Sequence, residues 1–76
     1  MEVQHGMKGR LKALQRAVDK LGGQNGTARE LSVAQSTVNY WLTKKHEVPA
    51  EYAGPLEAKS GISRHKLRPD IFGEES

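Results

Sequence analysis

The stretch "QNGTARELSVAQSTVNYWL", residues 24–42, decides the fold. In its first half Ala28 and Leu31 are three residues apart, which places both on one face of a short helix. A second helical face follows the linking residues 32–34 and comprises Val38, Trp41 and Leu42. Two helices this short, joined by so tight a linker, have to cross steeply and share a small core with Val33. The stretch therefore predicts a helix-turn-helix.

The second of these helices carries more hydrogen-bonding side chains than packing on a core requires. A helix fits the major groove of DNA, where each base pair shows a distinct pattern of donors, acceptors and methyl groups. The side chains predicted to read that pattern are Gln35, Ser36, Thr37, Asn39 and Tyr40. Those predicted to bind the phosphate backbone flank them in the sequence: Gln24, Asn25, Lys44 and Lys45. For the two lysines, a favourable interaction with the helix dipole explains their position nearly as well.

The sequence before the motif, "GRLKALQRAVDKLGG" at residues 9–23, predicts a longer helix. Its large apolar residues recur at spacings of three and four, which places them on one face: Leu11, Leu14, Val18 and Leu21. Ala13 and Ala17 add helix propensity. Gly22 and Gly23 are expected to end the helix, since glycine closes a last turn at little steric cost.

After the motif, Pro49 and Gly61 bracket another predicted helix, and Pro55 either kinks it or delays its start to about residue 55. Ser63 is placed to cap a last single turn. That turn ends before Pro69, and two apolar residues are then expected to fold back on the core as a clasp, Ile71 and Phe72.

These pieces predict one domain of residues 8–73, between a flexible N-terminal tail at residues 1–7 and a C-terminal tail at residues 74–76. A chain of 76 residues has no room for a deep substrate cavity beside its core, so an enzyme is disfavoured. No apolar run reaches the roughly 18–20 residues of a membrane span, and the first ten residues lack the hydrophobic segment of a signal peptide. These features predict a soluble intracellular protein that does not enter membranes.

Other chemistries find little support. The chain has no cysteine, and its three histidines lack ligand spacing, so neither a metal nor another cofactor is expected. Ser63, His65 and Asp70 cannot form a hydrolase triad, because one short segment cannot hold all three in the required geometry. Trp41 could stack on single-stranded bases, but its spacing from Val38 favours a place in the core.

The net charge of +3 hides an uneven distribution along the chain. Residues 8–45 carry eight basic and two acidic side chains, a charge of +6, whereas residues 46–76 carry four basic and six acidic ones, a charge of −2. Concentrated basic charge favours a polyanionic partner, and nucleic acid fits better than a membrane because no long amphipathic helix is present. An ordinary solvated basic face is the plain alternative.

Together these residues resemble the Cro-like and YdaS-like phage and prophage DNA-binding proteins, small regulators with a lambda-repressor-like fold. The resemblance covers residues 11–73 and rests on the motif together with "VPAE" at 48–51 and "LRPDIF" at 67–72. Two residues of the motif depart from the family pattern: Ser32 stands where glycine is usual, and Ala34 where a serine or threonine cap is common. The resemblance implies an all-α bundle of about five short helices that contains the helix-turn-helix.

The resemblance also implies a sequence-specific regulator that binds double-stranded DNA in the cytoplasm of a bacterial host, most plainly a Cro-like repressor. By family position, Gln35, Ser36 and Tyr40 lead the reading of bases. One short helix reads only about four to six base pairs, so a homodimer on a palindromic operator is expected. The candidates for its interface lie in the C-terminal half: Tyr52, Leu56, Ile71 and Phe72. A second hypothesis is the antitoxin, or another protein-interaction module, of a toxin–antitoxin pair with the same fold.

Overall fold

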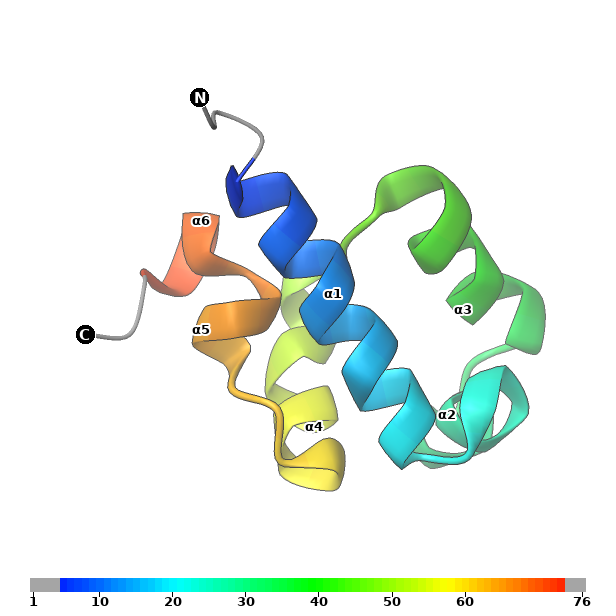
Figure 1. Ribbon diagram of the computed structural model, residues 1–76. Helices are drawn as coiled ribbons and strands as arrows, with labels where there is room; N and C mark the ends of the chain where they lie inside the picture. Colours follow the sequence, from blue (N-terminus) through cyan, green and yellow to red (C-terminus); the bar gives the residue numbers. More distant parts are fainter. Residues whose placement is uncertain (1–4, 74–76) are drawn as a thin grey trace.

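The computed structural model describes the backbone of residues 5–73 and the side chains of residues 9–73 (Figure 1). Within this part of the chain every element is helical, and no helix combines the length and apolar character that crossing a membrane requires. The predicted all-α fold is confirmed, with six α-helices in place of about five. The elements are α1 (His5–Lys20), α2 (Gly23–Leu31), α3 (Gln35–Tyr40), the π-helical turn η1 (Trp41–Lys45), α4 (Ala50–Ser60), α5 (Arg64–Leu67) and α6 (Pro69–Phe72).

The long helix α1 lies across the molecule, with α2 and α3 to one side of it and α5 and α6 to the other (Figure 1). Its predicted apolar face is confirmed: Leu14 and Val18 are buried and Leu11 and Leu21 are half-buried. The core gathers residues from α1 through α5, namely Ala13, Leu14, Ala17, Val18, Ala28, Leu31, Val38, Trp41, Val48, Ala53, Leu56, Ile62 and Leu67. One core therefore holds all of these elements together.

Helix α1 begins earlier than the sequence predicted. Its first residue is His5, so residues 5–7, expected in the flexible tail, are helical, and the other predicted tail residues, 1–4 and 74–76, lie outside the described part. Once the packed turns that follow are formed, extending a helix by one turn costs little because each added residue gains a hydrogen bond.

The junction of α1 and α2 depends on glycine. Gly22 and Gly23 adopt left-handed backbone angles, with φ of 91° and 88°, and end α1 where the sequence predicted. Gly26, inside α2, lies so close to the end of α1 that a Cβ there would clash with the carbonyl oxygen of Leu21. The two helices can therefore approach more closely than side chains at this point would allow.

Helix α4 runs unbroken from Ala50 to Ser60 with Pro55 inside it, so the predicted alternative of a start near residue 55 is wrong. Pro55 is exposed, which leaves room for its ring while Ala53 and Leu56 are buried. Gly61 closes the helix with φ of 81°, as predicted.

The predicted cap of the next turn is also confirmed, because the Ser63 hydroxyl accepts a hydrogen bond from the His65 backbone N–H at 3.0 Å. Helix α5 ends at Leu67, before Pro69, as predicted, but Pro69 then begins a further helical turn that the sequence did not predict. It occupies the first turn of α6, where its missing N–H has no helical partner to lose. The predicted clasp is half correct: Phe72 packs against the core, with its ring edge-on to His65, whereas Ile71 is turned outward and is 48% exposed.

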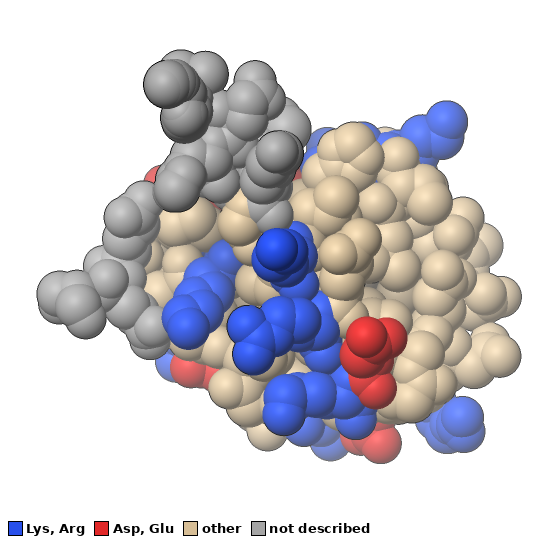
Figure 2. Space-filling view, in the orientation of Figure 1, with Lys and Arg blue, Asp and Glu red and all other residues tan. Residues whose placement is uncertain are grey.

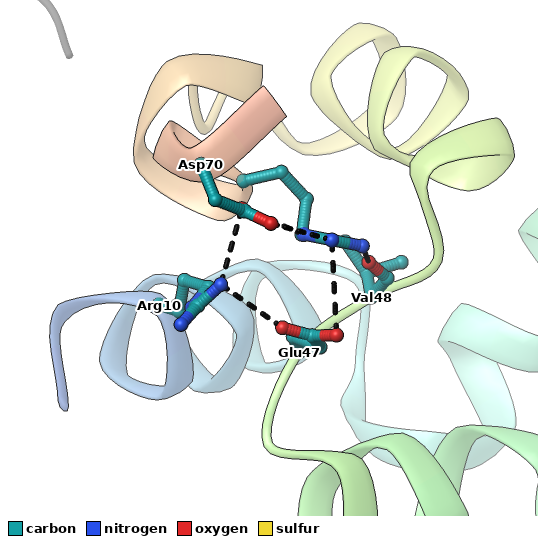
Figure 3. Close-up of polar contacts among 5 residues, drawn as sticks. Arg10, Glu47, Val48 and Asp70 are labelled. Atoms are coloured by element: carbon teal, nitrogen blue, oxygen red, sulfur yellow. Dashed lines mark hydrogen bonds and ion pairs between the residues drawn. The ribbon is translucent and has the colours of Figure 1, made fainter. Parts of the chain in front are cut away.

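A network of two arginines and two carboxylates joins both ends of the fold to the linker that follows η1 (Figure 3). Arg68 donates to both carboxylate oxygens of Asp70, at 3.0 and 2.8 Å, and to the Val48 carbonyl at 2.9 Å. Arg10 of α1 lies 3.1 Å from Glu47 and 3.1 Å from Asp70. The network therefore ties α1, the residues before α4, and α6 to one another.

Hydrogen bonding by Arg68 lowers the pKa of Asp70 from an ordinary value near 3.8 to about 2. Because the pKa in the folded state lies below that in the unfolded state, Asp70 stabilises the fold above about pH 4. This stabilisation is lost as the pH falls toward 2.

We expect Asp70→Asn to lower the melting temperature at pH 7, because it removes the bidentate charged pair with Arg68, and to flatten its dependence on pH between about 4 and 2. Thermal unfolding of both proteins across this range provides the measurement. Added salt should narrow the difference at pH 7, since the carboxylate is partly exposed and screened. Parallel pH curves for the two proteins would contradict the assignment.

We also expect Pro55→Ala to stabilise the protein by about 1–3 kcal/mol, because it restores a helical N–H in α4 and removes a ring from the helix interior. The comparison is Gly54→Ala, which has open space around it and should gain only about 0.5–1 kcal/mol. Chemical denaturation measures both. A Pro55→Ala protein less stable than the parent would mean that α4 needs the proline.

Candidate nucleic-acid interface

The turn between α2 and α3 is closed by Ser32 in a left-handed conformation, with φ of 57° and ψ of 44°. The Ser32 N–H donates to the Arg29 carbonyl and the Val33 N–H donates to the Ala28 carbonyl at 2.9 Å, which is the pattern of a Schellman helix end. A position of this kind favours glycine, because a left-handed L-residue costs roughly 1–2 kcal/mol. Ser32 therefore holds the turn in the geometry that glycine favours, and the fold is less stable than it would be with glycine at this position.

Helix α3 divides its side chains between core and solvent as the sequence predicted. Val38 is fully buried, and Trp41, next in line on the same face, is 3% exposed with its ring 5.3 Å from that of Tyr52. Trp41 is therefore a core residue, which rules out a stacking platform. Four of the five predicted base-reading residues are exposed and Thr37 is half-buried; the exposed ones are Gln35, Ser36, Asn39 and Tyr40.

Three amide side chains join the first turn of α2 to the exposed face of α3. Gln35 Nε2 donates to Gln24 Oε1 at 2.8 Å, and Gln24 Nε2 donates to Asn39 Oδ1 at 3.2 Å. We call these three residues the amide network. Gln24, predicted only to bind phosphate, thus also orients two predicted base readers, and the sequence analysis missed this role. The eleven-residue spacing of Gln24 and Gln35, each at the start of a motif helix, was the available signal.

The chain leaves α3 through η1, in which the His46 N–H donates to the Trp41 carbonyl at 2.7 Å across five residues. The Thr43 hydroxyl donates to the Asn39 carbonyl at 2.8 Å. Lys44 and Lys45 are exposed in this turn and lie beyond the last residue of α3, as the sequence predicted. Single π-turns in α-helices occur frequently at functional sites.

The basic side chains of residues 8–45 lie on two surfaces of the structure, one over α1 and the other at α2 and η1. Figure 2 shows lysine and arginine side chains gathered over α1 and the neighbouring α5, while most of the surface over α2 and α3 on this face carries neither sign of charge. Arg10 is paired with Glu47 and Asp70 in the network described above. The charge of residues 8–45 therefore does not lie mainly beside α3.

The geometry defines a small helix-turn-helix protein whose second motif helix presents a polar face to solvent. A family model described as "Bacterial toxin YdaS" matches residues 14–76, and the chain accordingly belongs to the YdaS family. The predicted family resemblance is thereby confirmed.

Known proteins similar to the chain include a curated relative and a solved structure. The "Putative transcriptional regulator YdaS" of Escherichia coli (strain K12) is 36% identical over an alignment of 53 residues that covers 67% of this chain and 54% of that protein. The chain thus spans about half the length of this relative. A solved structure, the "Cro protein from putative prophage element Xfaso 1" of Xylella fastidiosa strain Ann-1, matches with a TM-score of 0.75 and 35% identity over 80% of this chain and 95% of that one.

The first residue of α3 lacks a side-chain cap, because Ala34 occupies the N-cap position with φ of −72° and ψ of 149°. We expect Ala34→Ser to stabilise the protein by about 1 kcal/mol, since a hydroxyl here can accept an N–H of the first turn. Thermal unfolding measures the effect, and Ala34→Val, which cannot cap, is the control. Equal stabilisation by both variants would contradict the capping mechanism.

Proposed function

We propose that the chain is a sequence-specific regulator of transcription that reads double-stranded DNA with α3. The observation that carries this proposal is the amide network, because it fixes the orientation of two polar side chains that face solvent on the second motif helix. Side chains held before binding lose less conformational entropy when they meet a base edge.

The amide network leaves specific groups free for DNA. Gln35 donates one N–H to Gln24, so its second N–H and its Oε1 remain available, and adenine offers the matching acceptor N7 and donor N6–H in the major groove. Asn39 accepts from Gln24 through Oδ1 and keeps both N–H donors. Those donors suit the N7 and O6 acceptors of guanine. Ser36, Thr37 and Tyr40 complete the proposed reading surface.

Phosphate contacts are proposed for the residues around this surface. The second N–H of Gln24 and the exposed side chain of Asn25 lie in the first turn of α2, whose free backbone amides attract an anion. Lys44 and Lys45 extend from η1 at the other end of α3. These contacts position the protein on the duplex without selecting a sequence.

The proposed assembly is a homodimer on a palindromic operator whose half-sites are roughly 34 Å apart. It acts in the bacterial cytoplasm as a Cro-like repressor, by covering a promoter and without a catalytic step. Both similar proteins carry names that fit this proposal, a transcriptional regulator and a Cro protein. Of the predicted interface residues, Leu56 is fully buried, Tyr52 and Phe72 are half-buried against the core, and Ile71 is exposed, so Ile71 is the most accessible to a second copy.

The test uses duplexes selected by the protein from a random pool. We expect Gln35→Ala with Tyr40→Ala to remove the preference for selected over scrambled duplexes, because each bidentate base contact is worth about 1–3 kcal/mol of discrimination. The melting temperature should hardly change, since both side chains are exposed. Fluorescence anisotropy measures the affinities. Undiminished selectivity in the double variant would refute the proposal.

The control is Lys44→Gln with Lys45→Gln, which should weaken binding to selected and scrambled duplexes alike. Its dependence of log affinity on log salt should become shallower by about 0.9 for each phosphate that the variant no longer neutralises. Weaker binding confined to selected duplexes would contradict the phosphate-binding role of the two lysines.

The family description as a bacterial toxin supports a second candidate, in which the chain acts mainly through a protein partner, as one member of a toxin–antitoxin pair. The same double variant, Gln35→Ala with Tyr40→Ala, separates the two functions. If this variant keeps full biological activity but loses its preference for selected duplexes, the partner-binding function is favoured. If it loses both, the function as a DNA-binding regulator is favoured.

A further inference from the structure

A cavity of about 420 Å³ lies on the surface between α1 and the linker that joins α4 to α5. Ala13 and Ile62 form its apolar floor, and three cationic side chains surround it: Arg16 and Lys20 of α1 and Lys66 of α5. We call these five residues the basic groove. It lies in the region where Figure 2 shows lysine and arginine side chains gathered.

The basic groove is separate from the proposed DNA-reading surface. Ala13, Arg16 and Lys20 recur at spacings of three and four along α1 and so share one side of that helix. The side of α1 toward the helix-turn-helix carries Gln15 and Asp19, which line a smaller hollow with Gln24 and Leu42. A molecule in the basic groove would therefore leave the base-reading residues of α3 accessible.

Within the described part of the chain, no carboxylate forms an ion pair with a cation of the basic groove. Among residues 9–73 the paired carboxylates, Glu30, Glu47, Glu57 and Asp70, lie beside other cations: Lys59, Arg10, Arg64 and Arg68. Three like charges from two helices around one depression repel one another unless an anion joins them. The arrangement is therefore electrostatically complementary to an anionic ligand.

We propose that the basic groove binds a short acidic segment of a partner protein, with carboxylates on Arg16, Lys20 and Lys66 and a small apolar side chain over Ala13 and Ile62. A peptide enters a concave site of this volume, which lies in the range of ligand cavities. A duplex is convex and stiff, so its phosphates would meet the rim and leave the apolar floor uncovered. This inference does not depend on the DNA-reading role of α3, and it gives a DNA-bound copy a surface for recruiting a second protein.

The test measures binding of a fluorescein-labelled octapeptide of glutamate and leucine to the full chain by anisotropy, with the glutamine–leucine peptide as the uncharged comparison. The groove variant is Arg16→Gln with Lys20→Gln and Lys66→Gln. The matched control is Arg29→Gln with Lys44→Gln and Lys45→Gln, which removes the same charge elsewhere. All six side chains are exposed, and melting curves establish that both variants fold.

We expect the groove variant to bind the acidic peptide at least about tenfold more weakly than the parent, and the control to stay within about threefold, because only the first variant lacks the three cations around the groove. For a scrambled duplex we expect the reverse order, with the control variant weakened more. Equally weakened peptide binding in both variants, or no saturable binding by the parent, would overturn the proposal. If the groove variant weakens duplex binding more than the control variant does, the groove is a nucleic-acid surface, and the proposal is overturned as well.

Discussion

The burial of Val38 and Trp41 is the constraint on which the rest of the molecule depends. Helix α3 has only six residues, and a helix this short does not hold together in water without tertiary contacts. Two side chains on one face supply those contacts, with Trp41 against Tyr52. Because so little of α3 is needed for packing, the remaining positions are free to be polar, and the amide network can organise them toward solvent.

The hydrogen bonds of Arg68 bring together two stretches of this sequence that lie far apart along the chain. "VPAE" begins at Val48, whose carbonyl accepts from Arg68, and "LRPDIF" contains both Arg68 and its partner Asp70. Glu47, next to the first motif, and Arg10 on α1 complete the arrangement. The two motifs are therefore joined by one set of contacts. These contacts fix the linker after η1 and so constrain the direction of α3 relative to the core.

The spacing of apolar residues was sufficient to predict which positions on each helix are buried, because that depends on residues within one element. It placed Leu14, Val18, Ala28, Leu31, Val38 and Trp41 in the core, and cap residues correctly located the ends at Gly61 and Ser63. It could not anticipate features that arise between elements. The bond from Gln24 to Asn39 joins separate helices, α4 tolerates Pro55 because the ring faces solvent, and only the packing of α1 against α5 shows that Arg16, Lys20 and Lys66 surround one groove.

The π-turn η1 has a consequence for how such a protein changes over evolution. A π-turn holds one more residue than the α-helical turn it replaces, so removing a single codon from residues 41–45 restores ordinary helical spacing. Because the extra residue is accommodated within that one turn, such a deletion leaves the direction of the chain after η1 largely unchanged. A one-codon change can therefore add or remove the π-turn while α1 through α5 keep their common core and every side chain proposed to meet the bases is preserved.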